Sequence, residues 1–281
     1  MRNILFTLLL LVSFISFGQT ADEYFKSGFD KNKAKDYNGA ISDFNKAIEI
    51  NPNFSEAYNN RGLSKMNLKD YYGAISDYNK SIEINPNNAT AYLNRGVAKR
   101  NLKDYSGAIS DYNKAIEINP NLSGAYNNRG FLKHKLKDYY GAIREYSKAI
   151  ELNPNNAGAY NNRGLAKNDL KDYSGAINDY NKAIELNPND DGWGSIDKNG
   201  NVLRADIYYN RGLAKAKLKD FYGSISDFNK TIKFDPNYAK AYNNRGASKY
   251  YINDLKGACE DAKKSKSLGY DASKLIQLTC N

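Results

Sequence analysis

The chain has 281 residues and a net charge of +10, and 41% of its residues are hydrophobic, which is enough for a sizeable folded body. Six prolines exclude a proline-rich linker, and a single histidine with two cysteines leaves no cluster for a His/Cys metal site. The positive charge suits an anionic partner or a solvated, lysine-rich exterior. We favour the exterior, because the basic residues recur evenly without a dense block.

Residues 1–18 have the pattern of a secretory signal peptide. Arg2 precedes an apolar run from Ile4 to Phe17, and the small residues Ser16 and Gly18 stand where a signal peptidase reads. The run is shorter than the roughly 20 residues of a membrane-spanning helix. We therefore expect cleavage after Gly18, no stable membrane insertion, and a soluble periplasmic or extracellular protein.

The string AYNNRG and its variants begin at residues 57, 91, 125 and 159, always 34 apart, and again at 207 and 241. The interval before residue 207 is longer by 14 residues. All six prolines occupy one position of this repeat. A fixed period of this size predicts a solenoid of stacked repeats.

Each repeat is predicted to contain two helices. In the repeat 55–88, the first helix is expected over 57–68, and Asp70 caps the second. Apolar residues at helical spacing follow, and Asn85 before Pro86 ends the second helix, because a residue before proline disfavours helical geometry.

The period, with Tyr58, Gly62, Ala74, Tyr78 and Pro86, resembles the tetratricopeptide repeat family. The resemblance covers almost all of residues 19–272. It implies an all-α fold, a right-handed superhelical solenoid of seven antiparallel helix pairs with a C-terminal capping helix, whose first helices line a concave groove. The seven repeats are 21–54, 55–88, 89–122, 123–156, 157–190, 205–238 and 239–272. The first repeat departs from the pattern with EYFKSG, and the last has Tyr270 in place of proline.

Two segments lie outside the repeats. Residues 271–281 are expected to form the capping helix. Residues 191–204 are an insertion in which Asn199-Gly200 predicts a hairpin or looped finger. Its acidic and amide residues hint at a calcium loop, but the glycine comes two places early and the bidentate Glu is missing, so we expect no metal. Trp193 could equally contact a ligand or pack the insertion against the solenoid.

Helical rotation predicts where each residue of the string points. With Tyr58 as position 4, successive side chains turn by about 100°, so positions 4, 7, 8, 11 and 14 share the face toward the second helix. This face holds the tyrosine, Gly62, Leu68, the arginine of position 7 and the lysine of position 11. An acid stands opposite at position 23, so we expect a structural ladder of interhelix ion pairs rather than a cationic ligand site.

The opposite face carries amides beside an apolar stripe, and we expect it to bind a partner rather than merely to be solvated. The position-6 amides are Asn60, Asn94, Asn128, Asn162, Asn210 and Asn244. The position-9 stripe is Leu63, Val97, Phe131, Leu165 and Leu213. The resemblance implies that the position-6 asparagines hold the backbone of an extended peptide. Family members that grip a C-terminal carboxylate have Lys at position 5 and Asn at position 9, a pattern that this chain lacks.

Cys259 and Cys280 are predicted to form a disulfide. Each lies about ten residues from the helix break at 269–270, so an antiparallel hairpin places them side by side. The alternative is two small buried thiols, which export makes less favourable.

The sequence offers no catalytic constellation. His134 has no repeated nucleophile beside it, and we expect a surface residue there. There is no glycine-rich phosphate loop, so we expect no cofactor and no nucleic-acid platform. We expect a monomeric, non-catalytic scaffold that binds a protein or peptide partner. The alternatives are a self-assembling structural module, and a glycan-binding protein or enzyme that uses the insertion or His134.

Overall fold

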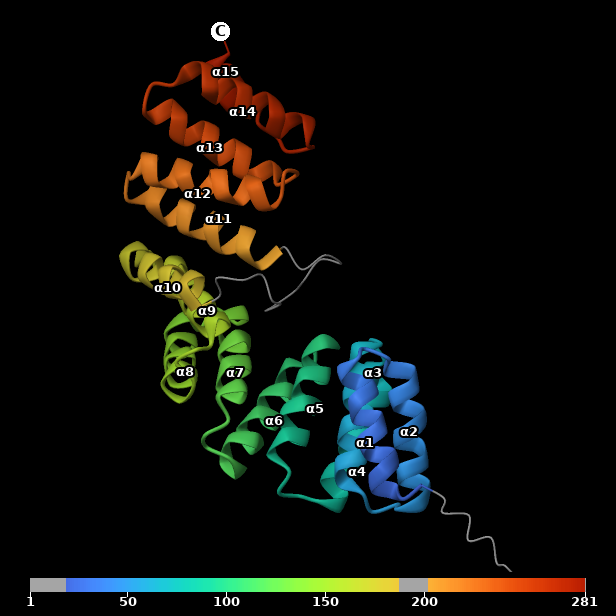
Figure 1. The fold of residues 1–281 in the computed structure, drawn as a ribbon. Coiled ribbons are helices and arrows are strands. Elements are labelled where there is room, and N and C mark those ends of the chain that lie inside the picture. Colours follow the sequence, from blue (N-terminus) through green and yellow to red (C-terminus); the bar gives the residue numbers. More distant parts are fainter. Residues whose placement is uncertain (1–18, 187–201, 281) are drawn as a thin grey trace, which may run out of the picture. The chain divides into compact units, whose positions relative to one another are not determined.

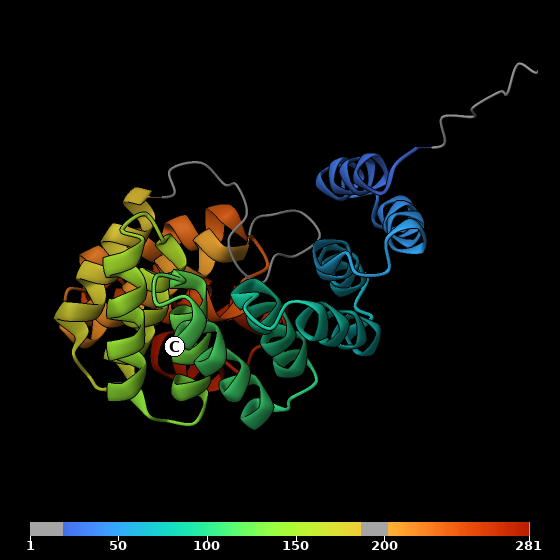
Figure 2. The same ribbon diagram turned by 90° about the horizontal axis from the view of Figure 1, so that it is seen from below.

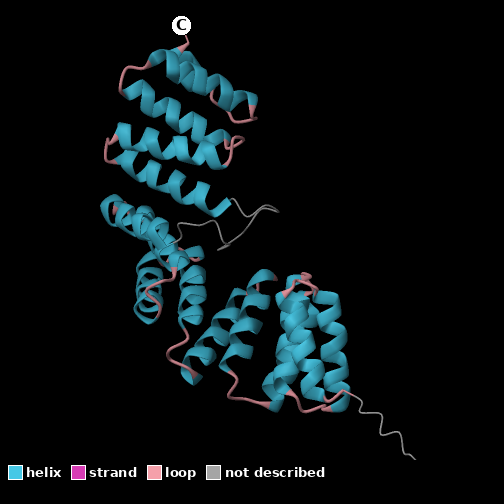
Figure 3. Cartoon of the chain, in the orientation of Figure 1, coloured by secondary structure: helices cyan, strands magenta, loops and turns pink. Residues whose placement is uncertain are grey.

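The computed structural model describes residues 19–186 and 202–280. All regular secondary structure in these residues is α-helical (Figure 3), which confirms the predicted all-α class. In the described ranges, no helix has the length and apolar character needed to cross a membrane. The predicted signal peptide and most of the insertion, with Trp193, Asn199 and Gly200, lie outside the described residues.

Two compact units make up the chain, residues 1–102 and 103–281. The helices of the first unit are α1 (Ala21–Lys33), α2 (Tyr37–Ile50), α3 (Ser55–Asn67), α4 (Tyr71–Ile84) and α5 (Ala89–Asn101). The second unit begins with α6 (Tyr105–Ile118), α7 (Ser123–Lys135), α8 (Tyr139–Leu152), α9 (Ala157–Asp169) and α10 (Tyr173–Leu186). It continues with α11 (Val202–Lys217), α12 (Phe221–Phe234), α13 (Ala239–Tyr251), α14 (Leu255–Ser267) and α15 (Ser273–Thr279).

Odd-numbered first helices pack against even-numbered second helices within each unit, as Figure 1 shows. In the first unit α1 pairs with α2 and α3 with α4, while α2 contacts α3 and α4 contacts α5. Figure 2 views these blue to teal helices nearly along their axes. In the second unit the pairs run from α7/α8 to α13/α14, and α10 contacts α11 although the insertion separates them in sequence. Helix stacking therefore continues past the insertion.

The turn inside each repeat has one geometry. Lys69 takes a left-handed backbone conformation (φ 64°), and six other repeats have a positive φ at the same position. The Asp70 side chain then accepts a hydrogen bond from the backbone N–H of Gly73 at 2.9 Å, which caps α4 as predicted. A Cβ on Gly73 would overlap this carboxylate, which explains the glycine.

Small residues and one aromatic side chain form the core of each repeat. Tyr78 of α4 is fully buried against the backbone of α3 at Gly62. A Cβ on Gly62 would lie 2.7 Å from Cε1 of Tyr78, so any larger residue would force the two helices apart. The predicted close approach of the two helices is confirmed.

One detail of the predicted inner face is wrong. Leu68 is 44% exposed, because α3 ends at Asn67 and Leu68 already belongs to the turn. Tyr58 is partly buried, and the guanidinium of Arg61 lies over its ring, with Cζ 5.2 Å from the ring centroid. The position-4 tyrosines therefore lie on the predicted inner face at the edge of the core, where Tyr208 is buried and Tyr126 and Tyr160 pack against core clusters.

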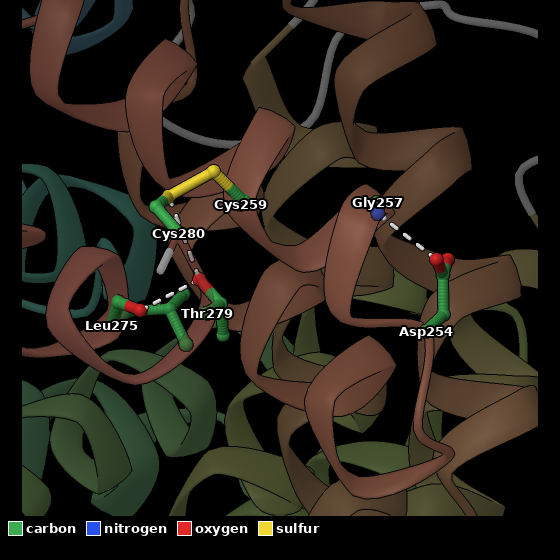
Figure 4. The surroundings of a disulfide bond; sticks show 6 residues. All are labelled: Asp254, Gly257, Cys259, Leu275, Thr279 and Cys280. Carbon is green, nitrogen blue, oxygen red and sulfur yellow. Dashed lines mark hydrogen bonds between the residues drawn. A yellow bond between two sulfur atoms is a disulfide. The ribbon is translucent and has the colours of Figure 1, made fainter.

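The C-terminal end of the second unit is closed by a short helix. α15 packs against α14 and α13, and its Leu275 is buried with Ala262 and Ala272. In the structure Cys259 of α14 is bonded to Cys280, the residue that follows α15, with a Cα–Cα distance of 5.0 Å (Figure 4). At the start of α11, Val202 extends the first helix of repeat six into the segment assigned to the insertion.

Candidate functional site

The arginine of the repeated string connects three helices. Arg61 of α3 donates from Nε and Nη2 to the two carboxylate oxygens of Asp77 on α4, at 3.0 and 2.6 Å. Its Nη1 donates to Asn45 Oδ1 on the preceding helix α2 at 2.7 Å. Lys65 Nζ lies 2.8 Å from the same carboxylate. The predicted interhelix ion pair is confirmed, and it also joins neighbouring repeats.

The same pairs recur in the second unit. They are Arg129–Glu145, Arg163–Asp179, Arg211–Asp227 and Arg245–Asp261. Asp77 keeps only 4% of its side chain exposed and Arg61 only 17%. In repeat one, Ser27 takes the place of the arginine and donates to Asp43 at 2.6 Å. Nε of Arg129 is buried without a hydrogen-bond partner among the described residues, but its Nη2 is paired with Glu145 as in the other pairs. Charges that are mostly buried and paired in this way hold helices together rather than face a ligand.

The position-6 asparagines follow a second, inter-repeat pattern. Nδ2 of Asn94 donates to Oδ1 of Asn59 at 3.1 Å, joining position 6 of one repeat to position 5 of the repeat before it. Asn162 donates to Asn127 in the same way at 3.3 Å. Asn244 donates to the hydroxyl of Tyr209, the position-5 residue of repeat six, at 2.9 Å. Sequence reasoning missed this bond, although the 35-residue offset between two amides was available as a signal.

The remaining position-6 amides differ. Nδ2 of Asn60 donates to the carbonyl of Glu56 in its own helix, and Nδ2 of Asn128 donates to that of Gly124. The Asn210 side chain makes no hydrogen bond to another described residue. Asn161, the position-5 residue of the preceding repeat, is buried, and its Oδ1 has no partner among the described residues. The amide pattern is therefore interrupted between repeats five and six.

These bonds leave capacity for a ligand. A side-chain amide has two N–H donors and one oxygen acceptor. The inter-repeat bond uses one N–H of Asn94, Asn162 or Asn244, so the amide oxygen and the second N–H remain. The predicted binding role of these residues is therefore compatible with a structural one.

Two adjoining hollows in the second unit are lined by residues at positions 5, 6 and 9 of the first helices. The first, of about 380 Å³, is lined by α11, α12 and α13 and includes Leu213, Phe221, Asn244 and Tyr251. The second, of about 270 Å³, lies between α13 and α15. Both are lined by Ala247 and Tyr251, so they form one continuous groove segment. The structure thus brings the predicted residues Leu213 and Asn244 together in this segment.

The predicted apolar stripe is unevenly exposed. Leu63 is 38% exposed, while Val97, Phe131 and Leu165 are partly buried. Leu165 packs against a core cluster that includes Tyr180 and Ile207. The stripe therefore offers its clearest free apolar surface at Leu63 and at the Leu213 hollow.

His134 has a partner that sequence spacing did not reveal. Its Nε2 lies 2.7 Å from Oδ2 of Asp169, the last residue of α9 in the next repeat. The expectation that His134 has no polar partner is therefore wrong, because the stacking of repeats places Asp169 of the next repeat beside it. Within residues 19–186 and 202–280 no group of three His, Cys, Asp or Glu side chains is placed to hold a metal.

Models of known sequence families match several segments of the chain. Models described as tetratricopeptide repeat match residues 55–88, 89–122 and 157–190, residues 111–144, and residues 205–238. A model described as TPR repeat matches residues 31–69 and 132–168. No curated protein matches the chain.

Several solved structures are similar. The structure of the APC/C hetero-tetramer Cut9-Hcn1 aligns with a TM-score of 0.70 and 18% identity. The alignment covers 92% of this chain and 49% of that chain. A tetratricopeptide repeat protein from Parabacteroides merdae aligns with a TM-score of 0.60 and 22% identity, covering 94% of this chain and 100% of that one. YrrB, described as a TPR protein with an unusual peptide-binding site, aligns with a TM-score of 0.61 and 21% identity. This alignment covers 73% of this chain and 98% of that one. At these identities the similarity establishes the fold.

Proposed function

Because the chain belongs to the tetratricopeptide repeat family, we propose that it is a non-catalytic scaffold that binds an extended segment of another protein. The bound segment lies along the face formed by positions 5, 6 and 9 of the first helices. The observation that supports this proposal best is the groove segment of the second unit. There the amide oxygen and the second N–H of Asn244, which the inter-repeat bond leaves unused, lie beside the apolar side chains of Leu213 and Phe221.

The chemistry of this face suits a peptide backbone. A side-chain amide donates and accepts as a peptide group does, so it can pair with an extended chain whatever its sequence. The apolar residues beside it then select side chains. The tyrosine rings of Tyr250 and Tyr251 add broad apolar surface at the C-terminal end of the groove.

The partner is a single chain rather than further copies of this one. End-to-end stacking requires a free last helix pair, and α15 already packs on α13 and α14. Light scattering is expected to give a monomer whose mass increases only when the partner is added. A concentration-dependent series of larger species would favour the self-assembling alternative.

A peptide array tests the main proposal. Wild-type protein is probed on short synthetic peptides, and the strongest binders are measured by calorimetry. The groove variant Ala247→Arg places a long charged side chain between the two hollows and is expected to abolish binding. The matched control Ser226→Arg changes an exposed position of the second helix α12 and is expected to leave affinity unchanged. Equal loss in both variants would place binding elsewhere.

We also propose that the protein is exported. The support is the sequence pattern of residues 1–18, with a basic start, an apolar run and small residues before the cut. Intact mass of the exported protein is expected to show a chain that begins at Gln19. A chain that keeps residues 1–18 would contradict export by cleavage.

A further inference from the structure

Asp206 differs from the acids of the ion-pair ladder. Asp227, on the neighbouring helix α12, is held by both Arg211 and Lys215. Asp206, at position 2 of repeat six on α11, accepts a hydrogen bond from the Tyr238 hydroxyl at 2.8 Å, and no described cation forms an ion pair with it. Lys240, at position 2 of the next repeat, is exposed and makes no such contact.

Two tyrosines surround this carboxylate. The ring of Tyr238 lies 4.9 Å from that of Tyr209, at an interplanar angle of 35°. Tyr209 in turn accepts the hydrogen bond of Asn244, which lines the groove segment. Asp206 and its two tyrosines therefore adjoin the face on which the peptide is proposed to lie.

The first unit contains the same arrangement without the polar groups. Phe25 and Phe54 occupy the positions of Tyr209 and Tyr238, and their rings also lie 4.9 Å apart, at 36°. Asp22, the counterpart of Asp206, is exposed and has no phenol hydroxyl beside it. Packing at this junction thus requires two aromatic rings, but it requires neither the hydroxyls nor a partly buried carboxylate.

Among the described side chains, no cation pairs with the carboxylate of Asp206. Partial burial raises its pKa, and the hydrogen bond from Tyr238 offsets only part of that effect. A partly buried carboxylate that lacks a cation gains more from an incoming positive charge than an exposed one does. Tyrosine faces beside it also attract cations.

We propose that Asp206, Tyr209 and Tyr238 form a subsite for one lysine or arginine side chain of the bound segment. This inference rests on the proposed function and names the chemistry of the partner. The whole chain carries +10, which opposes the approach of a strongly basic partner. The occupant is therefore an isolated basic residue in an otherwise neutral or acidic segment, and not a polybasic stretch.

The test compares three proteins on the same peptide array: wild type, Asp206→Asn and Asp22→Asn. Wild type and Asp22→Asn are expected to select peptides enriched in Lys or Arg at one position. Asp206→Asn is expected to lose that enrichment. Enrichment that is absent from wild type, or that survives in Asp206→Asn, would overturn the subsite while the proposed function stands. An array without any wild-type binder would overturn both.

A double-mutant cycle then measures the contact itself. One selected peptide and its Lys→Gln or Arg→Gln version are titrated into wild type and Asp206→Asn. The basic peptide is expected to bind Asp206→Asn about tenfold more weakly, while the Gln peptide binds both proteins alike. Equal losses for both peptides would show a general effect on the groove and contradict a direct contact.

Folding of the variants is checked by thermal unfolding. Asp206→Asn keeps an acceptor for Tyr238 and removes a partly buried charge that no described cation pairs with, so its Tm is expected to equal or exceed that of wild type. The double variant Tyr209→Phe/Tyr238→Phe reproduces the Phe25–Phe54 pair and is expected to stay folded while binding the basic peptide more weakly. Unchanged affinity in this folded double variant would remove the tyrosines from the subsite.

Discussion

Arg211 donates a hydrogen bond from Nη1 to Asn181 Oδ1 at 2.7 Å, although the insertion separates the two residues in sequence. Arg61 makes the equivalent bond to Asn45, and Arg245 makes it to Asn229, where no insertion intervenes. The junction between repeats five and six therefore has the same arginine contact as its neighbours. The arginine of the repeated string acts as an inter-repeat connector as well as an interhelix ion pair.

Replacing Arg211 with Ala is expected to lower stability without removing ligand binding. Asp227, with 1% of its side chain exposed, would keep only Lys215, and breaking a buried pair typically costs about 3–5 kcal/mol. Thermal unfolding and calorimetry with an array peptide measure the two effects separately. The control Lys233→Ala changes an exposed cation of α12 and should leave the Tm unchanged. Lost affinity at an unchanged Tm would place Arg211 in the binding site.

The Tyr78 hydroxyl leads to a prediction of the opposite sign. The side chain is fully buried, and its Oη has no hydrogen-bond partner among the described residues. Repeats one and six have Phe44 and Phe228 at this position. An unpaired buried hydroxyl costs about 1–3 kcal/mol, so Tyr78→Phe is expected to leave the Tm unchanged or to raise it. Tyr238→Phe, which removes a formed hydrogen bond, provides the contrast, and a clear loss of stability in Tyr78→Phe would contradict the structure.

Periodicity was sufficient to predict contacts within a repeat. A rotation of about 100° per residue places Arg61 opposite Asp77 and Gly62 opposite Tyr78, and both contacts are present. Contacts between repeats were not predictable in this way. The bond from Asn94 to Asn59 depends on how far one helix pair is shifted against the next, and that shift is set by packing.

The Asp206 cluster shows the same limit. Asp206 and Tyr238 are 32 residues apart, at positions 2 and 34 of repeat six, so rotation along a single helix gives no reason to connect them. Tyr209 and Tyr238 also differ from the residues that most other repeats have at positions 5 and 34. Such departures were visible in the sequence, but only the structure brings them to one place.

Asp206 also predicts a pH dependence of stability. Burial raises its pKa in the folded state, so the folded protein holds this proton more tightly than the unfolded chain does. This difference stabilises the folded protein fully at pH values below the pKa of Asp206 in the unfolded chain. The stabilisation is lost as pH rises through the pKa of Asp206 in the folded protein. Relative to Asp206→Asn, wild type should therefore become less stable from acid toward neutral pH. Parallel Tm-against-pH curves for the two proteins would contradict this.

The pairing of Cys259 with Cys280 is a prediction for the exported protein. The bond would close a loop of 21 residues and join α14 to the end of α15, where no further repeat supports the solenoid. A loop of this length contributes roughly 3 kcal/mol in the chain-entropy model. Native protein should have no free thiol, and Cys259→Ser and Cys280→Ser should each lower the Tm as much as the double variant. Two reactive thiols in native exported protein would contradict the bond.

The predicted asparagine ladder is best tested where its structural role is absent. Asn210→Ala removes an amide that bonds to no other described residue, whereas Asn162→Ala also breaks the bond to Asn127. Asn210→Ala should therefore keep the wild-type Tm and weaken peptide binding by roughly two- to tenfold, the value of one neutral hydrogen bond. Asn162→Ala should lower both the Tm and the affinity, and the triple variant of Asn94, Asn128 and Asn162 should bind at least about tenfold more weakly. Calorimetry with an array peptide, beside thermal unfolding of each protein, separates the two roles. If both Asn210→Ala and the folded triple variant keep wild-type affinity, these amides do not contact the peptide. Binding would then depend on the apolar side chains that line the groove, such as Leu213 and Tyr251.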